Sequence, residues 1–344
     1  MNKPQRAWRN VGIVGGVLVA LAIATVIVLY LVPSNDYILL PDRAHPVAPL
    51  VSVKGGKDPA GPGGVYFVDV FERRASIFES IFPSIHKGST LVPAKLIVPP
   101  GVSDKAVRQA DLRAMSISQR VAAAVALKRL GYKVTAKPSG VIVSALDSRS
   151  HAVGKLRPAD VITAVNGSPT PTIAKLRTAL AEVKPGETVN LTISRSTGAA
   201  GATKLDVDVK TMAEGKRAIV GFAPEQAANI HLPIKVSIDA GNVGGPSAGL
   251  AFALQVMEEL GKNVDRGYKV AATGEINLDG TVSAIGGVKQ KTYGVRKAGA
   301  DVFLVPVDGD NAKEAKRYAG GLRIIPVTSF PQALRALATL PPKR

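Results

Sequence analysis

The chain has 344 residues, of which 46% are apolar, 20% are charged and none is cysteine. This length suits two modest domains with linkers, and the lack of cysteine excludes disulfides, thiolate catalysis and cysteine-ligated zinc. The formal net charge is +18, but the basic residues are spread along the chain without an arginine-rich tract. We therefore expect no nucleic-acid partner.

The N-terminal segment predicts a membrane span. Lys3, Arg6 and Arg9 precede an uncharged run from residue 11 to residue 32, which as a helix would be ~33 Å long and would cross a hydrocarbon core of about 30 Å. A cleaved signal peptide is the alternative, but its apolar region is usually shorter and ends in an Ala-x-Ala site, which is missing here. Because the positive flank comes first, we expect a cytoplasmic N-terminus, with everything after residue 32 outside the cytoplasmic membrane.

The segment after the span predicts little regular structure at first. Residues 33–64 are rich in proline and glycine and favour an irregular tether. Val65–Val70 has the pattern of a strand, and a helix is expected over Ser118–Leu130, ending at Gly131. The sequence leaves open whether that strand joins the sheet of the C-terminal domain, in which case residues 132–211 are an insertion.

Residues 132–211 alternate short strands with one helix. The pattern predicts strands at 140–143, 160–165 and 188–194, a tight turn at Asn166-Gly167 and a helix over Thr172–Val183. Three blocks resemble a bacterial PDZ domain: Ser-Gly-Val-Ile-Val at 139–143, Gly-Lys-Leu-Arg-Pro-Ala-Asp-Val-Ile at 154–162 and Val-Asn-Gly at 165–167. Ala159 stands where the family usually has glycine, which affects the turn geometry.

The PDZ resemblance implies a peptide site. The loop before Val141 would bind the C-terminal carboxylate of a peptide through backbone N–H groups, and the peptide would add as a strand beside Val141–Val143. The implied peptide-binding residues are Ser139, Gly140, Val141, Ile142 and Val143. A module that serves only as a spacer or docking surface is the alternative.

From Met212 onward the pattern predicts an α/β domain. We expect helices over Ser247–Leu260, Val288–Ala298, Asn311–Tyr318 and Pro331–Leu340. We expect strands over Lys269–Ala272, Thr281–Ile285, Asp301–Val305 and Leu322–Val327. The first two strands would be joined across a turn at Asp279-Gly280.

Ser247 is the candidate nucleophile. It lies in a Gly-Pro-Ser-Ala-Gly block at residues 245–249, at the expected start of a helix, where free N–H groups favour a developing oxyanion. A serine that merely caps the helix is the alternative. The block also fits the Gly-x-Ser-x-Gly elbow of α/β-hydrolases, but these enzymes place a histidine after the serine, and all four histidines precede Ser247.

A serine nucleophile needs a base. A different Ser–His order, with His231 as the base, stays open but has no motif context, and the other option is a lysine with a lowered pKa. The Gly-Gly-Val-Lys-Gln-Lys block at 286–291 offers Lys289 and Lys291. On a helix these residues lie about 200° apart, so one can point into the domain while the other faces solvent. For either lysine, a solvated helix face is the alternative.

Three blocks, in this order, resemble the proteolytic domain of Lon-type proteases: Gly-Gly-Pro-Ser-Ala-Gly at 244–249, Thr-Gly-Glu-Ile at 273–276 and Ile-Gly-Gly-Val-Lys-Gln-Lys at 285–291. With the span and the PDZ-like segment, the whole chain resembles the membrane-anchored, PDZ-containing Lon-like proteases of bacteria. The resemblance implies an α/β Lon-type proteolytic domain and a small β-rich PDZ-like domain behind one transmembrane helix.

The same resemblance assigns roles to residues. Ser247 would be the nucleophile, Lys291 the base and Thr273 a neighbour that steadies the amine of the lysine. The substrate approach and the oxyanion site would be formed by Gly245, Pro246 and Ala248. Gly244 stands where ATP-dependent members often carry an acidic residue.

The implied function is that of an ATP-independent serine endopeptidase of the bacterial cell membrane. No Gly-x-x-x-x-Gly-Lys-Ser/Thr loop occurs in the sequence, so we expect flexible or unfolded extracytoplasmic polypeptides as substrates, no metal or cofactor, and a homo-oligomer. A membrane-anchored PDZ adaptor on an inactive protease-like scaffold is the alternative. The expected segments are a basic N-terminus (1–10), a transmembrane helix (11–32), a tether and N-terminal extension (33–131), a PDZ-like domain (132–211) and a proteolytic domain (212–344).

Overall fold

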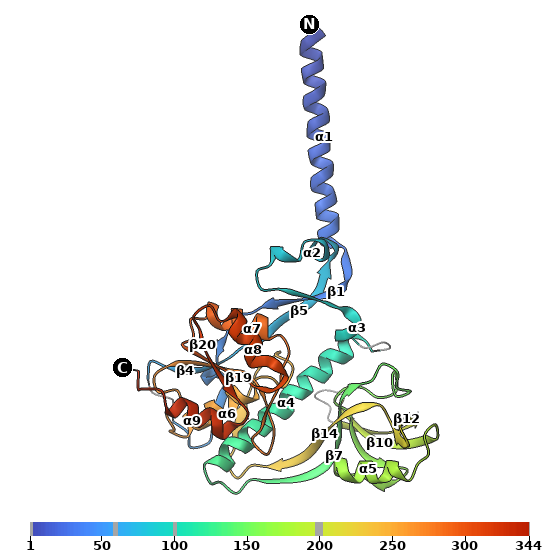
Figure 1. Cartoon of the computed structure of the whole chain (residues 1–344), viewed down its shortest axis with the longest axis vertical. Helices are drawn as coiled ribbons and strands as arrows, with labels where there is room; N and C mark the ends of the chain where they lie inside the picture. Colours follow the sequence, from blue (N-terminus) through green and yellow to red (C-terminus); the bar gives the residue numbers. More distant parts are fainter. Residues whose placement is uncertain (1–2, 58–60, 99–101, 197–201, 344) are drawn as a thin grey trace.

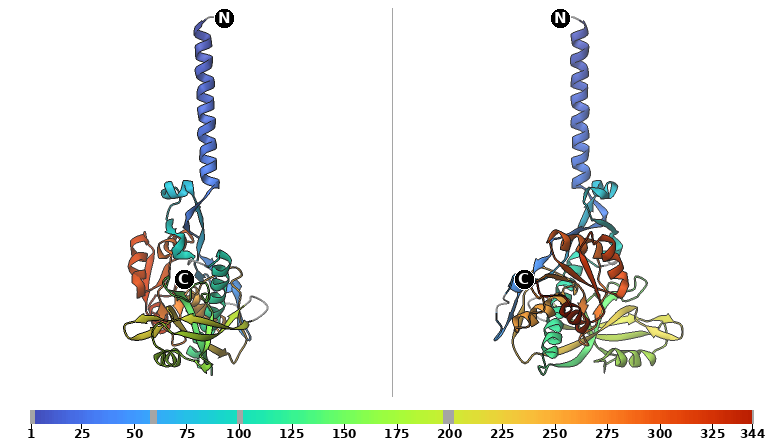
Figure 2. Two further views of the ribbon diagram at one scale, coloured as in Figure 1. Left: turned by 90° about the vertical axis from the view of Figure 1, so that its right-hand side faces the viewer. Right: turned by 60° about the vertical axis from the view of Figure 1, so that its left-hand side comes forward.

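The computed structural model describes residues 3–57, 61–98, 102–196 and 202–343. Helix α1 (Lys3–Leu31) projects from the body of the molecule as one long helix (Figures 1 and 2). Within the described residues, Val14–Leu31 is the one stretch that is long and apolar enough to cross a membrane, and the body buries none of it. A signal sequence meets the same criteria.

The segment after α1 is folded, which corrects the expected tether. Strand β1 (Pro33–Pro41) pairs antiparallel with β5 (Val70–Ser76) and β6 (Thr90–Pro93) in a three-stranded sheet at the foot of α1. The prediction of a tether rested on prolines, but Pro33 and Pro41 lie at the two ends of β1. At a strand end, the missing N–H group of proline removes no hydrogen bond from the middle of the sheet. Short helices α2 (Ile77–Ile81) and α3 (Ala94–Ile97) follow β5 and β6.

A second sheet forms the centre of the C-terminal domain. Its five strands, in spatial order, are β2 (His45–Pro46), β4 (Gly64–Phe67), β16 (Lys269–Ala272), β19 (Val302–Pro306) and β20 (Arg323–Val327). β4 runs parallel to β16 and pairs with it. The strand expected at Val65–Val70 is shorter: it ends at Phe67 as β4, which joins the C-terminal sheet, while Val70 begins β5 of the three-stranded sheet. The chain between β4 and β16 contains the PDZ segment.

Helices cover both faces of this sheet, as expected for an α/β domain. On one face, α4 (Asp104–Arg129), α6 (Gly249–Glu259) and α9 (Phe330–Ala338) pack with Val270 and Ala272 of β16. On the other face, α7 (Val288–Lys297) and α8 (Asn311–Tyr318) pack with Ala271. The sequence predicts only the second half of α4, from Ser118. In the first half, charged residues interrupt the helical spacing of apolar residues from which a helix is predicted.

The strand expected at Thr281–Ile285 is shorter and pairs elsewhere. It is β18 (Val282–Ser283), and its partner is β17 (Glu275–Ile276). It cannot pair with β16, because β4 and β19 occupy both edges of that strand.

The PDZ segment forms the third large sheet. Its main strands, in spatial order, are β11 (Ala202–Lys210), β10 (Thr188–Ser196), β8 (Val161–Val165), β7 (Thr135–Leu146) and β14 (Phe222–His231), with β9 (Ser168–Pro169) beside β8 and helix α5 (Ile173–Ala181). Asn166 and Gly167 have φ values of 47° and 78°, as the predicted tight turn requires. Two small antiparallel pairs complete the fold, β12 (Met212–Glu214) with β13 (Arg217–Ile219) and β3 (Val51–Val53) with β15 (Val236–Ile238).

Strand β14 corrects the expected peptide site. Val141 and Ile142 pair with β8 on one edge and with β14 on the other. Ser139 and Gly140, expected in the carboxylate-binding loop before Val141, lie within β7, and Gly140 pairs with Ala227 of β14. In this conformation β14 occupies the edge that a peptide would need. No local pattern predicted this pairing, because β14 lies beyond residue 211. The domain boundary at 211 itself stays a prediction.

Candidate active site

Ser247 lies in the turn before α6, held against the Thr-Gly-Glu block. Its carbonyl oxygen accepts hydrogen bonds from the N–H of Gly274 (2.8 Å) and from Oγ1 of Thr273 (3.1 Å). Helix α6 begins two residues later than expected, with Ala248 as its N-cap residue and no side-chain cap. Ser247 therefore does not serve as a helix cap, and its hydroxyl group is available for chemistry.

Lys291 reaches Ser247 from the first turn of α7. Gly287 precedes this helix with a φ of 69°, a left-handed conformation that glycine adopts without strain. Lys291 Nζ lies 2.8 Å from Ser247 Oγ and 3.4 Å from Thr273 Oγ1. The structure thus brings together the three residues that the sequence assigns to the dyad and its neighbour.

The environment of Lys291 favours its neutral form. The side chain is only 4% exposed, and this burial lowers its pKa from 10.5 to about 7, against an opposing effect of Asp69. An amine with this pKa is largely neutral just above pH 7. It can then accept a proton from the serine hydroxyl group that it contacts.

Lys289, the other lysine of the block, lies away from Ser247. Its Nζ donates a hydrogen bond to the carbonyl oxygen of Ser89 (2.7 Å) and lies 5.7 Å from the centre of the Tyr318 ring. It therefore fixes the segment before β6 to α7, which corrects the expectation that one lysine would only face solvent.

Two of the three residues expected around the oxyanion, Gly245 and Pro246, have other hydrogen-bond partners. The N–H of Gly245 already donates to the carbonyl oxygen of Asp111 (2.8 Å), and Pro246 accepts a hydrogen bond from Ser118 Oγ (2.9 Å). Among the residues that the structure describes, the backbone N–H groups of Ser247 and Ala248 have no acceptor. These two groups, at the start of α6, are the available donors for an oxyanion.

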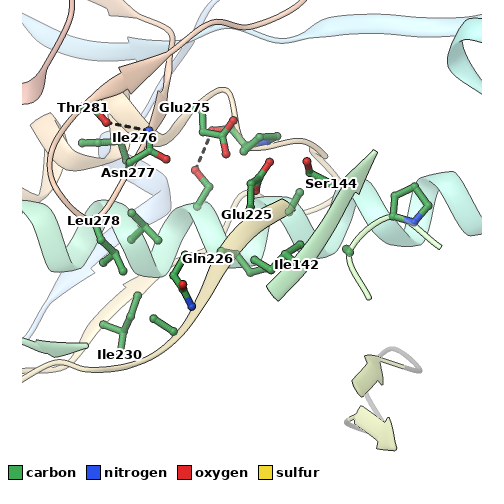
Figure 3. Close-up of a pocket in the computed structure, with 18 of the residues that line it drawn as sticks. Ile142, Ser144, Glu225, Gln226, Ile230, Glu275, Ile276, Asn277, Leu278 and Thr281 are labelled. Atoms are coloured by element: carbon green, nitrogen blue, oxygen red, sulfur yellow. Dashed lines mark hydrogen bonds between the residues drawn. The ribbon is translucent and has the colours of Figure 1, made fainter. Parts of the chain in front are cut away.

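Ser247 and Lys291 open onto a cavity of about 930 Å³. A second cavity, of about 640 Å³, lies between α4, β7, β14 and the loop after β17, and shares Asp111, Pro246 and Glu275 with the first (Figure 3). Burial raises the pKa of Glu275 to about 7, and Glu225 of β14 adds to this effect. Glu275 belongs to the Thr-Gly-Glu-Ile block, but the sequence assigned it no role, and no motif marked Glu225, which a distant segment brings to this cavity.

Two parts of the chain match models of known families. Residues 208–339 match the Lon protease (S16) C-terminal proteolytic domain, and residues 128–211 match the PDZ domain. The chain carries a Lon-type proteolytic domain and a PDZ domain. Ser247, Thr273 and Lys291 all lie within the Lon-type match.

Curated relatives of the Lon-type domain are themselves Lon proteases. Lon protease 1 of Sorangium cellulosum is 36% identical over 109 residues, 29% of this chain and 13% of that protein. Lon protease 2 of Bacillus subtilis is 27% identical over 187 residues, 52% of this chain and 32% of that protein. The chain therefore spans a third or less of the length of these two relatives.

Among solved structures, the PDZ domain of the SdrC-like protein from Listeria monocytogenes is similar at 22% identity, with a TM-score of 0.23 over 27% of this chain and 93% of that one.

One acidic residue of α4 lies close to the Lon-type serine block. A Cβ atom placed on Gly244 would lie 2.7 Å from the Cβ of Asp111, so Asp111 fills the space that a side chain at 244 would need. Burial raises the pKa of Asp111. Gly244, which by the resemblance stands where ATP-dependent members often carry an acidic residue, thus has Asp111 of another segment beside it.

One group of possible metal ligands adjoins the Lon-type site. Asp42, His45 and Asp69 place their ligand atoms within 4.8 Å of one another. Burial raises the pKa of Asp69, and the charge of Asp42 raises it further. Exposed acidic groups are common without a metal, and His45 is exposed. The expectation that this protein needs no metal stays a prediction.

Proposed function

We propose that this protein is an ATP-independent serine endopeptidase with a Ser247–Lys291 dyad, anchored in the membrane by α1. The observation that supports it most is the 2.8 Å contact between Ser247 Oγ and the Nζ of a buried lysine with a pKa of about 7. The Lon-type proteolytic domain is that of a serine peptidase, and with the PDZ domain it points to polypeptide substrates. Oligomer formation is proposed from the resemblance alone.

The geometry supports an acyl-enzyme mechanism. Neutral Lys291 accepts the proton of Ser247 as Oγ attacks the peptide carbonyl carbon, and the N–H groups of Ser247 and Ala248 hold the oxyanion. Thr273 Oγ1 accepts a hydrogen bond from the resulting ammonium group. Lys291 then donates the proton to the leaving amine as the C–N bond breaks. A water molecule, deprotonated by the same lysine, hydrolyses the ester and restores Ser247.

Labelling intact spheroplasts with a charged, membrane-impermeant fluorophosphonate tests the activity and the orientation together. We expect labelling of the wild-type protein before lysis, and none of the Ser247→Ala variant. Labelling that appears only after lysis would contradict an extracytoplasmic site. If the wild type stays unlabelled in both states, the alternative of an inactive PDZ adaptor is favoured.

The rate of peptide hydrolysis should rise with pH through a midpoint near 7. Below the midpoint Lys291 is an ammonium ion and cannot accept a proton; above it the amine is neutral, so the rate reaches a plateau. Burial places the pKa of both Lys291 and Glu275 at about 7, so the Glu275→Gln variant is the control. The profile of kcat/KM for a short fluorogenic peptide should keep its midpoint in that variant. A profile that is flat over about pH 5 to 9, or a rise that Glu275→Gln removes, would contradict the role of Lys291.

A further inference from the structure

Helix α2 and the 3-10 turn after it (Pro83–Ile85) expose apolar side chains at the foot of α1. Ile81, Phe82 and Ile85 are 55%, 49% and 46% exposed. Figure 1 shows α2 beside the lower end of α1, at the end of the body nearest the helix. Clustered exposed apolar groups of this kind mark surfaces that bind an apolar partner.

Contacts fix this segment to the end of α1. The Tyr30 and Phe78 rings lie 6.4 Å apart between their centres. The N–H of Ile77 donates to the carbonyl oxygen of Val32 (2.9 Å), and the Ser80 hydroxyl group donates to that of Ser34 (2.8 Å). The position of α2 relative to the apolar helix is therefore set by the fold.

The charged side chain within residues 77–85, that of Glu79, points inward. Glu79 of α2 is fully buried; it forms an ion pair with Arg73 (2.6 Å) and a hydrogen-bond contact with Nε2 of His86 (2.7 Å). It also completes a capping box with Ser76 at the start of α2. The exposed side chains of residues 81–85 are apolar except for that of Ser84, and the Phe82 ring packs on the Phe78 ring at 5.0 Å between centres.

We propose that α2 and the following turn lie in the lipid headgroup region of the bilayer that α1 crosses, with Ile81, Phe82 and Ile85 inserted toward the acyl chains. This rests on the membrane anchor of the proposed function. Lipid is the partner that the position favours, because a surface fixed to the end of a spanning helix lies at the membrane boundary. Aromatic and branched apolar side chains are enriched there. The body then has two points of attachment, which restrict its tilt and rotation about α1.

Fluorescence quenching by brominated lipids tests this placement in the full chain in nanodiscs. Trp8, the single tryptophan, is first replaced by phenylalanine, and Phe82→Trp then supplies the probe. Val28→Trp in α1 reports insertion of the span, and Leu96→Trp, on the more distant α3 and 70% exposed, is the matched exposed control. With lipids brominated near the headgroup end of the acyl chain, we expect at least ~2-fold stronger quenching for Phe82→Trp than for Leu96→Trp.

The outcomes separate the inference from the anchor on which it rests. Quenching of Val28→Trp without quenching of Phe82→Trp above the Leu96→Trp level would overturn the inference and leave the anchor intact. Absence of quenching at both positions would overturn the anchor as well. Ile85→Trp is a second probe of the same surface and should follow Phe82→Trp, so that a local disturbance at residue 82 does not decide the result.

Discussion

The Lys291→Arg variant should be folded and inactive, with kcat/KM for peptide hydrolysis reduced at least ~1,000-fold, or about 4 kcal/mol of transition-state stabilisation. Arginine keeps a positive charge, but its guanidinium group stays protonated near neutral pH and cannot accept the proton of Ser247. The guanidinium group is also larger than the amine that it replaces. It has little room, because the Lys291 amine is buried and lies 2.8 Å from Ser247 Oγ. Steady-state kinetics with a short fluorogenic peptide measures the loss.

Two variants serve as references for this loss. Ser247→Ala should be equally inactive, because it removes the nucleophile. Lys289→Ala removes a lysine of the same helix and should retain hydrolysis, while losing only ~1 kcal/mol of folding stability with its bond to Ser89. An active Lys291→Arg enzyme, or a folded but inactive Lys289→Ala enzyme, would show that the base is assigned to the wrong lysine.

The Gly294→Ala variant should be destabilised by at least ~3 kcal/mol, or fail to fold. Gly294 lies on the face of α7 that approaches residues 42–44, and the N–H of Ala44 donates to its carbonyl oxygen (3.4 Å). A Cβ atom at position 294 would overlap the carbonyl oxygen of Asp42. Because backbone cannot yield as a flexible side chain does, α7 would have to move and carry Lys291 away from Ser247. Urea unfolding followed by circular dichroism measures the change.

The matched control is Gly286→Ala, a glycine just before the same helix. A Cβ atom there meets nothing within 4 Å, so we expect a change within about 0.5 kcal/mol, the usual range for open surface positions. If Gly294→Ala unfolds at the same urea concentration as Gly286→Ala, the close approach of α7 to residues 42–44 is not a constraint on the fold.

The sequence predicts most of the C-terminal domain because local signals mark it. The bounds of β16 and α8 agree with the predicted ranges, and the alternation of helices and strands identifies the α/β class. The three blocks that hold Ser247, Thr273 and Lys291 are each short and continuous. Each block could therefore be read without knowing how the chain folds between them.

The rest depends on contacts between distant segments. Asp111 and Glu275 line the same cavities only because α4 packs beside β17. The pairing of β4 with β16 joins segments far apart in the chain, which no local pattern encodes. In the same way, the sequence of β7 predicts a free edge that can bind a peptide, because the strand that pairs with this edge, β14, comes about 80 residues later in the chain.

Strand β14 connects the two domains. It pairs with β7 along the PDZ sheet, while its own Ile230 packs against the core of the proteolytic domain. Unfolding of either domain would remove packing or pairing partners of β14. We therefore expect a change that stabilises one domain to raise the free energy of unfolding of the other as well. A peptide that binds β7 must first displace β14, and its apparent affinity is reduced by the free energy of that pairing. Reciprocally, a ligand that shifts Ile230 within the proteolytic core would change the free energy of pairing between β14 and β7 in the PDZ sheet.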